Sequence, residues 1–165
     1  MGMANGTTLF LRRHDLNNKM KIDKILNLIG KRLENVNYAF IGSANLYIQG
    51  AGVQPRDIDI LTTPKGIKEI DKIFSKSRTK EIYFDESDGR NSFRSLYMID
   101  GKEIEVLGNV GNVYRKSEIL DKRIYIKFNK IKLPCIPLTD ELNTYKQMGR
   151  AEKVEMIQEF LQLQK

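Results

Sequence analysis

The run Asp57-Ile58-Asp59-Ile60-Leu61 alternates polar and apolar side chains, and this alternation constrains the fold more than any other feature of the chain. A period of two is typical of a β-strand, whose successive side chains point to opposite faces. Ile58 and Ile60 therefore predict a buried face, while Asp57 and Asp59 predict two carboxylates on the other face, roughly 7 Å apart. Like charges at this spacing repel each other and strands are poor in Asp, so the pair indicates a bound cation. An isolated Asp-x-Asp at a strand end also occurs as a purely structural feature.

Helix and strand patterns surround this run. Apolar residues at helical spacing predict an amphipathic helix before it, and these are Ile22, Ile25, Leu26, Ile29 and Leu33. Residues 38–41 form a short apolar run that predicts a buried strand, and Gly42-Ser43 follows it and leads into a short helix over residues 43–49. Pro64 opens another amphipathic helix.

The second half of the chain predicts further strands and then helices. Strand patterns cover residues 82–108, and Asp100-Gly101 between residues 92–99 and 102–107 is a strong hairpin signal. A second hairpin is expected across Asn129-Lys130. Thr139 is expected to cap a C-terminal helix that ends near Gly149, before a last helix.

Together these patterns predict an α/β (α+β) fold with a mixed twisted sheet of about five strands, flanked by helices and followed by a short helical end. We expect a flexible N-terminal extension over residues 1–19 and a single domain over residues 20–165, with the C-terminal helices at residues 139–163. A chain of 165 residues is long enough for one compact core.

Composition excludes several kinds of site. The chain has one cysteine, Cys135, and one histidine, His14, which argues against a disulfide framework, a multi-cysteine zinc site and Ser-His-Asp chemistry. It has no apolar stretch of the roughly 20 residues that a membrane helix needs and no apolar core of a secretory signal, so we expect no membrane association and a cytoplasmic location. The net charge of +7 favours an anionic partner.

Two further features extend the Asp57–Asp59 pair into a candidate site. Gly42 permits close backbone approach at the junction of a strand and a helix, and the N–H groups at a helix start together with the Ser43 hydroxyl can hold a phosphate. Glu105 lies between apolar residues on a later strand and is the favoured third acid, while Glu103, nearer the hairpin turn, is the alternative.

Gly42-Ser43, thirteen intervening residues, Asp57-Ile58-Asp59 and the later Glu105 resemble the motif of the DNA polymerase beta-like nucleotidyltransferase superfamily. The chain also resembles a small prokaryotic family of mostly uncharacterised nucleotidyltransferases. The resemblance extends over about residues 20–163 and includes the stretches 131–134 and 149–153.

The resemblance implies transfer of a nucleoside monophosphate, most simply AMP from ATP, to an acceptor hydroxyl with release of pyrophosphate. By this analogy Asp57, Asp59 and Glu105 are the catalytic residues and hold Mg²⁺ or Mn²⁺, whose oxygen ligands they match in type. Gly42 and Ser43 would hold the nucleoside triphosphate. Lys146 is a further candidate for phosphate binding, and Arg150 and Lys153 match basic positions of the family.

The acceptor is left open among a protein, a small molecule and an RNA. Large members of the superfamily grip nucleic acid with extra domains, and 165 residues leave little room for these, so a processive polymerase is not expected. The alternative is a non-catalytic or antitoxin-type module of the same fold that binds a nucleotide or a protein. A homodimer through a sheet edge or through the C-terminal helices is also left open.

Overall fold

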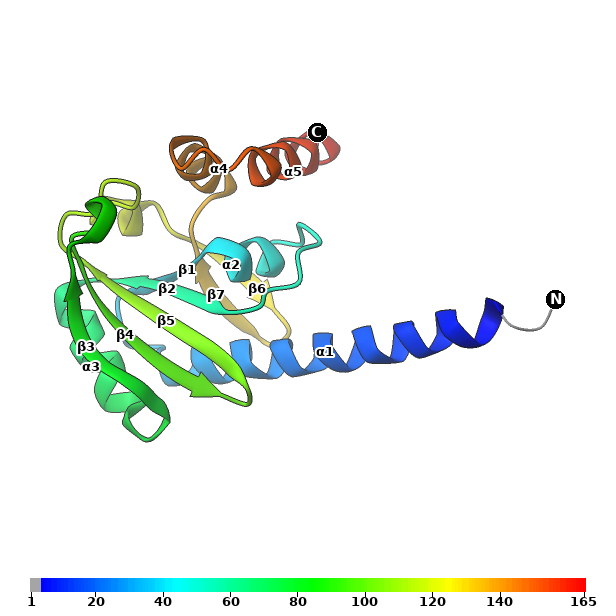
Figure 1. Ribbon diagram of the computed structural model, residues 1–165, viewed down its shortest axis with the longest axis horizontal. Helices are drawn as coiled ribbons and strands as arrows, with labels where there is room; N and C mark the ends of the chain where they lie inside the picture. Colours follow the sequence, from blue (N-terminus) through cyan, green and yellow to red (C-terminus); the bar gives the residue numbers. More distant parts are fainter. Residues whose placement is uncertain (1–3) are drawn as a thin grey trace.

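A single mixed sheet organises the protein, whose computed structural model describes residues 4–165, with side chains from Arg13 onward. The strand order is β3-β4-β5-β2-β1-β7-β6 (Figure 1). The strands are β1 (Tyr38–Ile41), β2 (Ile58–Thr62), β3 (Arg78–Asp85), β4 (Ser92–Ile99), β5 (Lys102–Asn109), β6 (Ile124–Phe128) and β7 (Ile131–Cys135). The predicted mixed sheet is confirmed, with seven strands instead of about five. The clearest difference is β3, whose side chains are all exposed or half-buried and therefore show no burial alternation.

Strand pairing brings residues that are distant in the sequence together at the centre of the sheet. β2 pairs with β5 in parallel and with β1 in antiparallel register, and β1 pairs with β7 in parallel. The outer pairs β3–β4, β4–β5 and β6–β7 are antiparallel. Both predicted hairpins are confirmed, and positive φ angles occur at Asp100 (48°), Gly101 (77°) and Asn129 (54°). These left-handed positions are what two-residue hairpin turns require.

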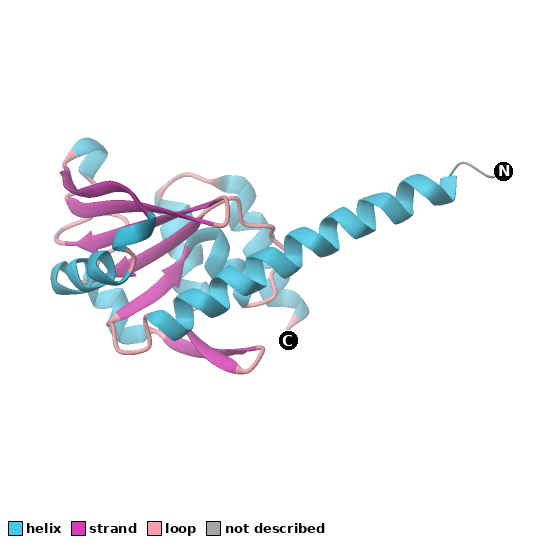
Figure 2. Cartoon of the chain, turned by 90° about the horizontal axis from the view of Figure 1, so that it is seen from below, coloured by secondary structure: helices cyan, strands magenta, loops and turns pink. Residues whose placement is uncertain are grey.

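Two helices cover one face of the sheet. α1 (Ala4–Arg32) and α3 (Pro64–Ile73) lie on this face (Figures 1 and 2). The predicted apolar stripe of α1 is buried here together with Ile58, Ile60 and Ile104 of the central strands. α3 begins as Pro64 predicts, with the Thr63 hydroxyl accepting a 2.9 Å hydrogen bond from the Gly66 N–H.

The N-terminal part of α1 projects away from the rest of the chain (Figure 2). The helix begins at Ala4, inside the segment predicted to be a flexible extension, and every side chain from Arg13 to Lys21 is exposed. Burial begins at Ile22. Residues 1–3 lie outside the described residues, and the domain boundary at residue 20 stays a prediction.

The C-terminal helices lie across from the opposite face of the sheet (Figure 1). α4 (Leu138–Gln147) and α5 (Ala151–Leu163) pack against α2 (Gly42–Ile48) through a separate apolar cluster around Leu46, Tyr145 and Ile157. The prediction that Thr139 caps α4 is wrong, because the helix begins at Leu138 and Pro137, two residues before Thr139, takes the cap position without a side-chain hydrogen bond. Gly149, with φ +70°, separates the two helices.

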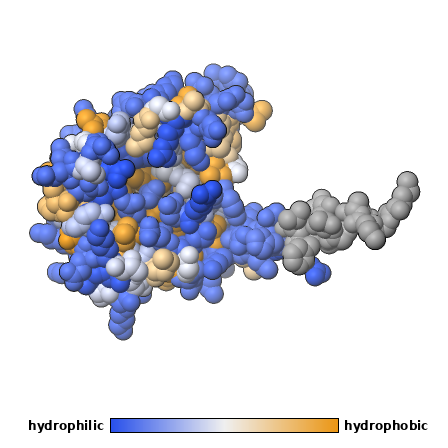
Figure 3. Space-filling model, in the orientation of Figure 1, coloured by the Kyte–Doolittle hydropathy of each residue, from blue (hydrophilic) through white to orange (hydrophobic). Residues whose placement is uncertain are grey.

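The surface view in Figure 3 is largely hydrophilic, with small scattered apolar areas on the face shown. Among the described residues, no helix combines the length and the apolar character needed to span a bilayer.

Candidate active site

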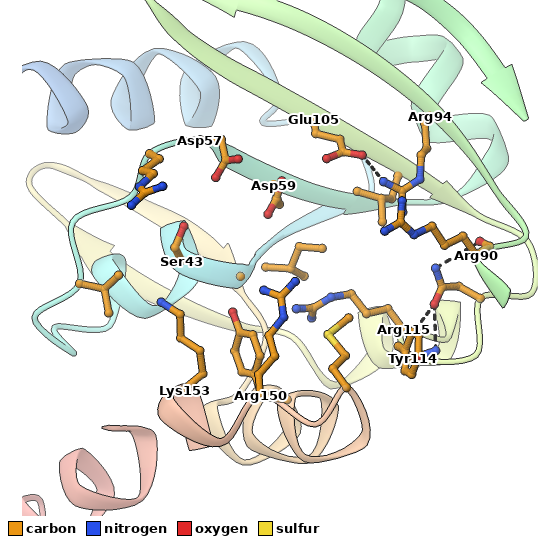
Figure 4. Close-up of a pocket in the computed structure, with 18 of the residues that line it drawn as sticks. Ser43, Asp57, Asp59, Arg90, Arg94, Glu105, Tyr114, Arg115, Arg150 and Lys153 are labelled. Carbon is orange, nitrogen blue, oxygen red and sulfur yellow. Dashed lines mark hydrogen bonds and ion pairs between the residues drawn. The ribbon is translucent and has the colours of Figure 1, made fainter. Parts of the chain in front are cut away.

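A cleft of about 650 Å³ opens between the sheet and the C-terminal helices (Figure 4). Five of the predicted site residues line it, namely Gly42, Ser43, Asp57, Asp59 and Glu105. The remaining candidate, Lys146, is exposed on α4 and is not among the residues that line the cleft. The cleft therefore gathers the motif residues into one place, although they are up to 63 positions apart in the sequence (105 − 42).

The three acids come from the two central parallel strands. Asp59 on β2 pairs in register with Glu105 on β5, and Asp57 lies immediately before β2 (Figure 4). Alternation along β5 would allow Glu103 to share a face with Glu105, but Glu103 is exposed and does not line the cleft. The structure thus places Glu105, and not Glu103, next to Asp59.

Asp59 lies in a negative and poorly hydrated environment. Burial raises its pKa from 3.8 to about 7, with further raising contributions from the carboxylates of Glu105 and Asp57, while the Arg115 guanidinium opposes the shift. A carboxyl group with so high a pKa is one whose negative charge lacks a sufficient partner within the protein. A cation bound beside Asp59 would supply that charge.

The three carboxylates suit Mg²⁺ or Mn²⁺ in donor type, because both ions prefer hard oxygen ligands. Their oxygens are not gathered on one point, however, and no group of three such side chains in the described residues forms a ready metal site. The Glu105 carboxylate forms an ion pair with Arg94 (Figure 4). Arg94 also lies 3.4 Å from Oδ2 of Asp85 through its Nε atom, so a second carboxylate is at hand for this guanidinium.

Gly42 has a conformational role that no other residue fills well. Its φ of +64° lies in the left-handed region, and a Cβ atom there would lie 3.0 Å from Oδ2 of Asp59. The glycine therefore lets the turn between β1 and α2 approach Asp59. The expectation that its N–H is free to bind a phosphate is wrong, because this N–H donates a 3.1 Å hydrogen bond to Oε1 of Glu141. Ser43 remains half-buried at the cleft.

Basic side chains surround the acids, and they outnumber them in the cleft lining. The cations are Arg56, Arg90, Arg94, Arg115, Arg150 and Lys153. Arg150 and Lys153 reach the cleft from the start of α5 (Figure 4), and in the described part of the chain neither these two nor Arg56 takes part in an ion pair. Three cations without an ion-pair partner in the described residues, in the same cleft as Ser43, make the cleft attractive to a polyphosphate.

Sequence reasoning missed several members of the site, among them Arg115 and Glu141. Arg115 lies in the loop after β5 and lines the cleft, and Glu141 lies on α4 with no exposed surface. Their guanidinium and carboxylate groups form a buried ion pair with N–O distances of 3.1 and 3.0 Å. Glu141 lies in the first turn of α4, where acidic residues are common, and no local pattern distinguishes Arg115 from the chain's other arginines.

A solved structure from Thermotoga maritima, described as a "putative nucleotidyltransferase", is similar to this chain. The two share 28% sequence identity with a TM-score of 0.69, over 84% of this chain and 91% of that one. The chain has a nucleotidyltransferase-like fold. A scan of protein-family models gave no match, and a search of curated proteins gave no significant one. The similarity supports a transferase, and the description of that protein names no nucleotide, cation or acceptor.

Proposed function

We propose that this protein is a metal-dependent nucleotidyltransferase that moves a nucleoside monophosphate, most simply AMP from ATP, to an acceptor hydroxyl. The observation that carries the proposal is the parallel register of Asp59 and Glu105, with Asp57 beside them, in a cleft whose other charged lining residues are all cations. Three acids and six basic side chains in one cleft match a polyphosphate that arrives together with divalent cations.

The acids would hold Mg²⁺ or Mn²⁺, which would supply electrostatic stabilisation of the reacting phosphate and lower the pKa of a bound hydroxyl. Arg56, Arg150, Lys153 and the Ser43 hydroxyl would bind the β- and γ-phosphates and so orient the α-phosphate toward the acids. The sequence-based candidate Lys146 stays a prediction, and its exposed position suits it less than Lys153.

The reaction forms a bond between the acceptor oxygen and the α-phosphorus and breaks the bond between the α-phosphorus and the oxygen that leads to the β-phosphate. Pyrophosphate leaves toward the basic end of the cleft. We assign Glu105 as the group that accepts the hydroxyl proton, because its carboxylate is a quarter exposed and borders the open cleft. Release of Glu105 from Arg94 would accompany this role, with Asp85 as the other partner of the guanidinium.

Matched variants on one strand test the proposal. Glu105→Gln and Glu103→Gln remove one carboxylate each, two residues apart, inside and outside the cleft. We expect Mg²⁺ to strengthen ATP binding by the wild type, measured by titration calorimetry, and Asp59→Asn to abolish this effect. In extracts incubated with α-labelled ATP, Glu105→Gln should abolish labelling of an acceptor and Glu103→Gln should leave it unchanged.

The outcomes separate the two candidate functions. Binding of ATP by the wild type without labelled product above the Asp59→Asn control would favour the non-catalytic or antitoxin-type module. Failure of ATP and of the other nucleoside triphosphates to bind in the presence of Mg²⁺ or Mn²⁺ would remove the proposal. A cytoplasmic location and a homodimer stay predictions.

A further inference from the structure

Glu141 is a fully buried carboxylate that accepts hydrogen bonds from three residues in two separate segments, α2 and the loop after β5. Its Oε1 atom accepts from the Gly42 N–H and from Nδ2 of Asn45, each at 3.1 Å. The Arg115 guanidinium donates to both carboxylate oxygens, at 3.1 and 3.0 Å. A buried carboxylate with four donors is fully solvated by the protein, and this arrangement orients all four donors.

The partners of Glu141 are parts of the candidate active site. Gly42 and Asn45 belong to the turn and helix beside Asp59, and Arg115 lines the cleft from the loop after β5. Glu141 itself lies on α4, in the helix pair that carries Tyr145 and the basic end of the cleft. The Glu141 carboxylate thus connects α4 to α2 and to the Arg115 guanidinium, and it fixes their positions relative to each other.

Stability alone does not explain this ion pair. Removing two charges from water costs several kcal/mol for each ion, and apolar residues of similar volume are often as stabilising as a buried pair. The guanidinium also differs from an ordinary buried partner, because Arg115 lines the cleft (Figure 4) while Glu141 accepts hydrogen bonds from both of its terminal nitrogens. A cation held by one edge, with its remaining surface facing a polyphosphate site, is oriented before the ligand arrives.

We propose that Glu141 is a positioning residue, which holds the Arg115 guanidinium in place for a nucleotide phosphate and ties the C-terminal helices to the Gly42 turn. The inference rests on the proposed function, because Arg115 then contacts the substrate and Glu141 acts through Arg115. It adds two residues that the sequence motif does not contain.

A double-mutant cycle on Mg²⁺–ATP affinity tests this role in the full chain. The variants are Arg115→Gln, Glu141→Gln and the double variant, all measured by titration calorimetry. We expect each single variant to weaken binding by about tenfold or more and the double variant to bind no more weakly than the weaker single variant. Additive losses, or wild-type affinity in Glu141→Gln, would overturn the inference.

The neighbouring Asp140 provides the matched control. It lies on the same turn of α4 and pairs with Lys122 at 3.3 Å on the protein surface. Asp140→Asn should leave Mg²⁺–ATP affinity within about twofold of the wild type, since exposed pairs contribute little. A loss equal to that of Glu141→Gln would show a general effect of charge on α4 and contradict a specific role for Glu141.

The double variant also guards against misfolding. A single variant leaves one buried charge without its partner, whereas Arg115→Gln with Glu141→Gln removes both charges and keeps hydrogen-bonding groups. If a single variant does not fold, the Mg²⁺–ATP affinity of the folded double variant decides. An affinity equal to that of the wild type overturns the inference, and an affinity at least about tenfold weaker supports it. Absence of nucleotide binding by the wild type would instead be a failure of the proposed function.

Discussion

The carboxyl group of Asp59 is costly to ionise in the folded protein. Its pKa is raised from 3.8 to about 7 by burial and by the carboxylates of Glu105 and Asp57, so at neutral pH ionising it costs the folded, metal-free protein free energy. A structural residue under such a penalty would serve the fold better as an uncharged side chain. This cost is consistent with a functional carboxylate whose partner is a cation.

The raised pKa predicts a pH-dependent stability. Between about pH 4 and about pH 7 the folded protein keeps a proton on Asp59 that the unfolded chain has released, so the metal-free protein should lose stability as the pH rises through this window. Asp59→Asn should reduce that loss by an amount of the order of a few kcal/mol. Urea denaturation in EDTA at several pH values measures it, with Glu103→Gln as control. Parallel profiles for wild type and Asp59→Asn would contradict the prediction.

A comparison of alanine substitutions at Gly42 and Gly52 distinguishes the cost of a left-handed backbone from the cost of a close contact with Asp59. Both glycines have positive φ angles, +64° and +74°, but a Cβ at Gly42 would lie 3.0 Å from the Asp59 carboxylate and one at Gly52 would meet nothing within 4 Å. Replacing Gly52 by Ala should cost roughly 1–2 kcal/mol, the penalty of a left-handed L-residue. Gly42→Ala should cost more than Gly52→Ala and should also weaken Mg²⁺–ATP binding.

Chemical denaturation of the two alanine variants provides the comparison. The Gly52→Ala variant should retain nucleotide affinity, since its added methyl group faces open space. Equal losses of stability with equal affinity would mean that the close approach of Gly42 to Asp59 has no consequence for the site.

The positions of the C-terminal helices decide which of their basic side chains line the cleft. α4 and α5 both carry lysines, but Lys146 on α4 is exposed outside the cleft and Lys153 on the first turn of α5 lines it. The change of direction at Gly149 presents the start of α5 to the cleft. Both residues are lysines, so the helix that carries each one decides whether it can reach a phosphate in the cleft.

Paired lysine variants test this difference between the helices. Lys153→Met should weaken Mg²⁺–ATP binding several-fold, because it removes an uncompensated cation from the cleft, and Lys146→Met should have little effect. Calorimetric affinities of the two variants against the wild type give the answer. The reverse order would support the sequence-based assignment of Lys146.

For the molecule as a whole, a local group of acids lies inside a basic protein. The net charge is +7, and the cleft itself has six basic and three acidic side chains in its lining. Such a charge distribution attracts anions over distances of the order of the Debye length, about 8 Å at physiological ionic strength.

Salt should therefore weaken the binding of Mg²⁺–ATP. Raising NaCl from about 50 to about 300 mM is expected to reduce the affinity several-fold through screening of the partly exposed cations. Calorimetry over this range measures the effect, and thermal unfolding in the same buffers checks that the protein stays folded. An affinity that does not change with salt would argue that the cleft cations do not contact the ligand.

Local patterns predicted much of the fold and the central acids of the site. Alternation placed Asp57 and Asp59 on one face, Asp100-Gly101 indicated its hairpin, and the apolar flanks of Glu105 favoured it over Glu103. Each of these signals is carried by residues within a few positions of one another, where backbone geometry links sequence spacing directly to direction.

The remaining features depend on contacts between distant segments. β3 was incompletely predicted because an exposed edge strand has little apolar pattern, and the start of α4 depended on Pro137. The Arg115–Glu141 pair joins a loop to a helix, and the Gly42 amide joins a turn to that same helix 99 residues later.

By itself, the sequence determined most of the strands and helices and that Asp57 and Asp59 share a face, because these follow from short-range backbone periods. Only the tertiary structure decided that Asp59 lies beside Glu105, that Lys153 and not Lys146 lines the cleft, and that Glu141 holds Arg115 and Gly42. Hydrogen bonds and ion pairs between distant segments have no period in the sequence, and they form only where packing of the apolar faces brings the segments together.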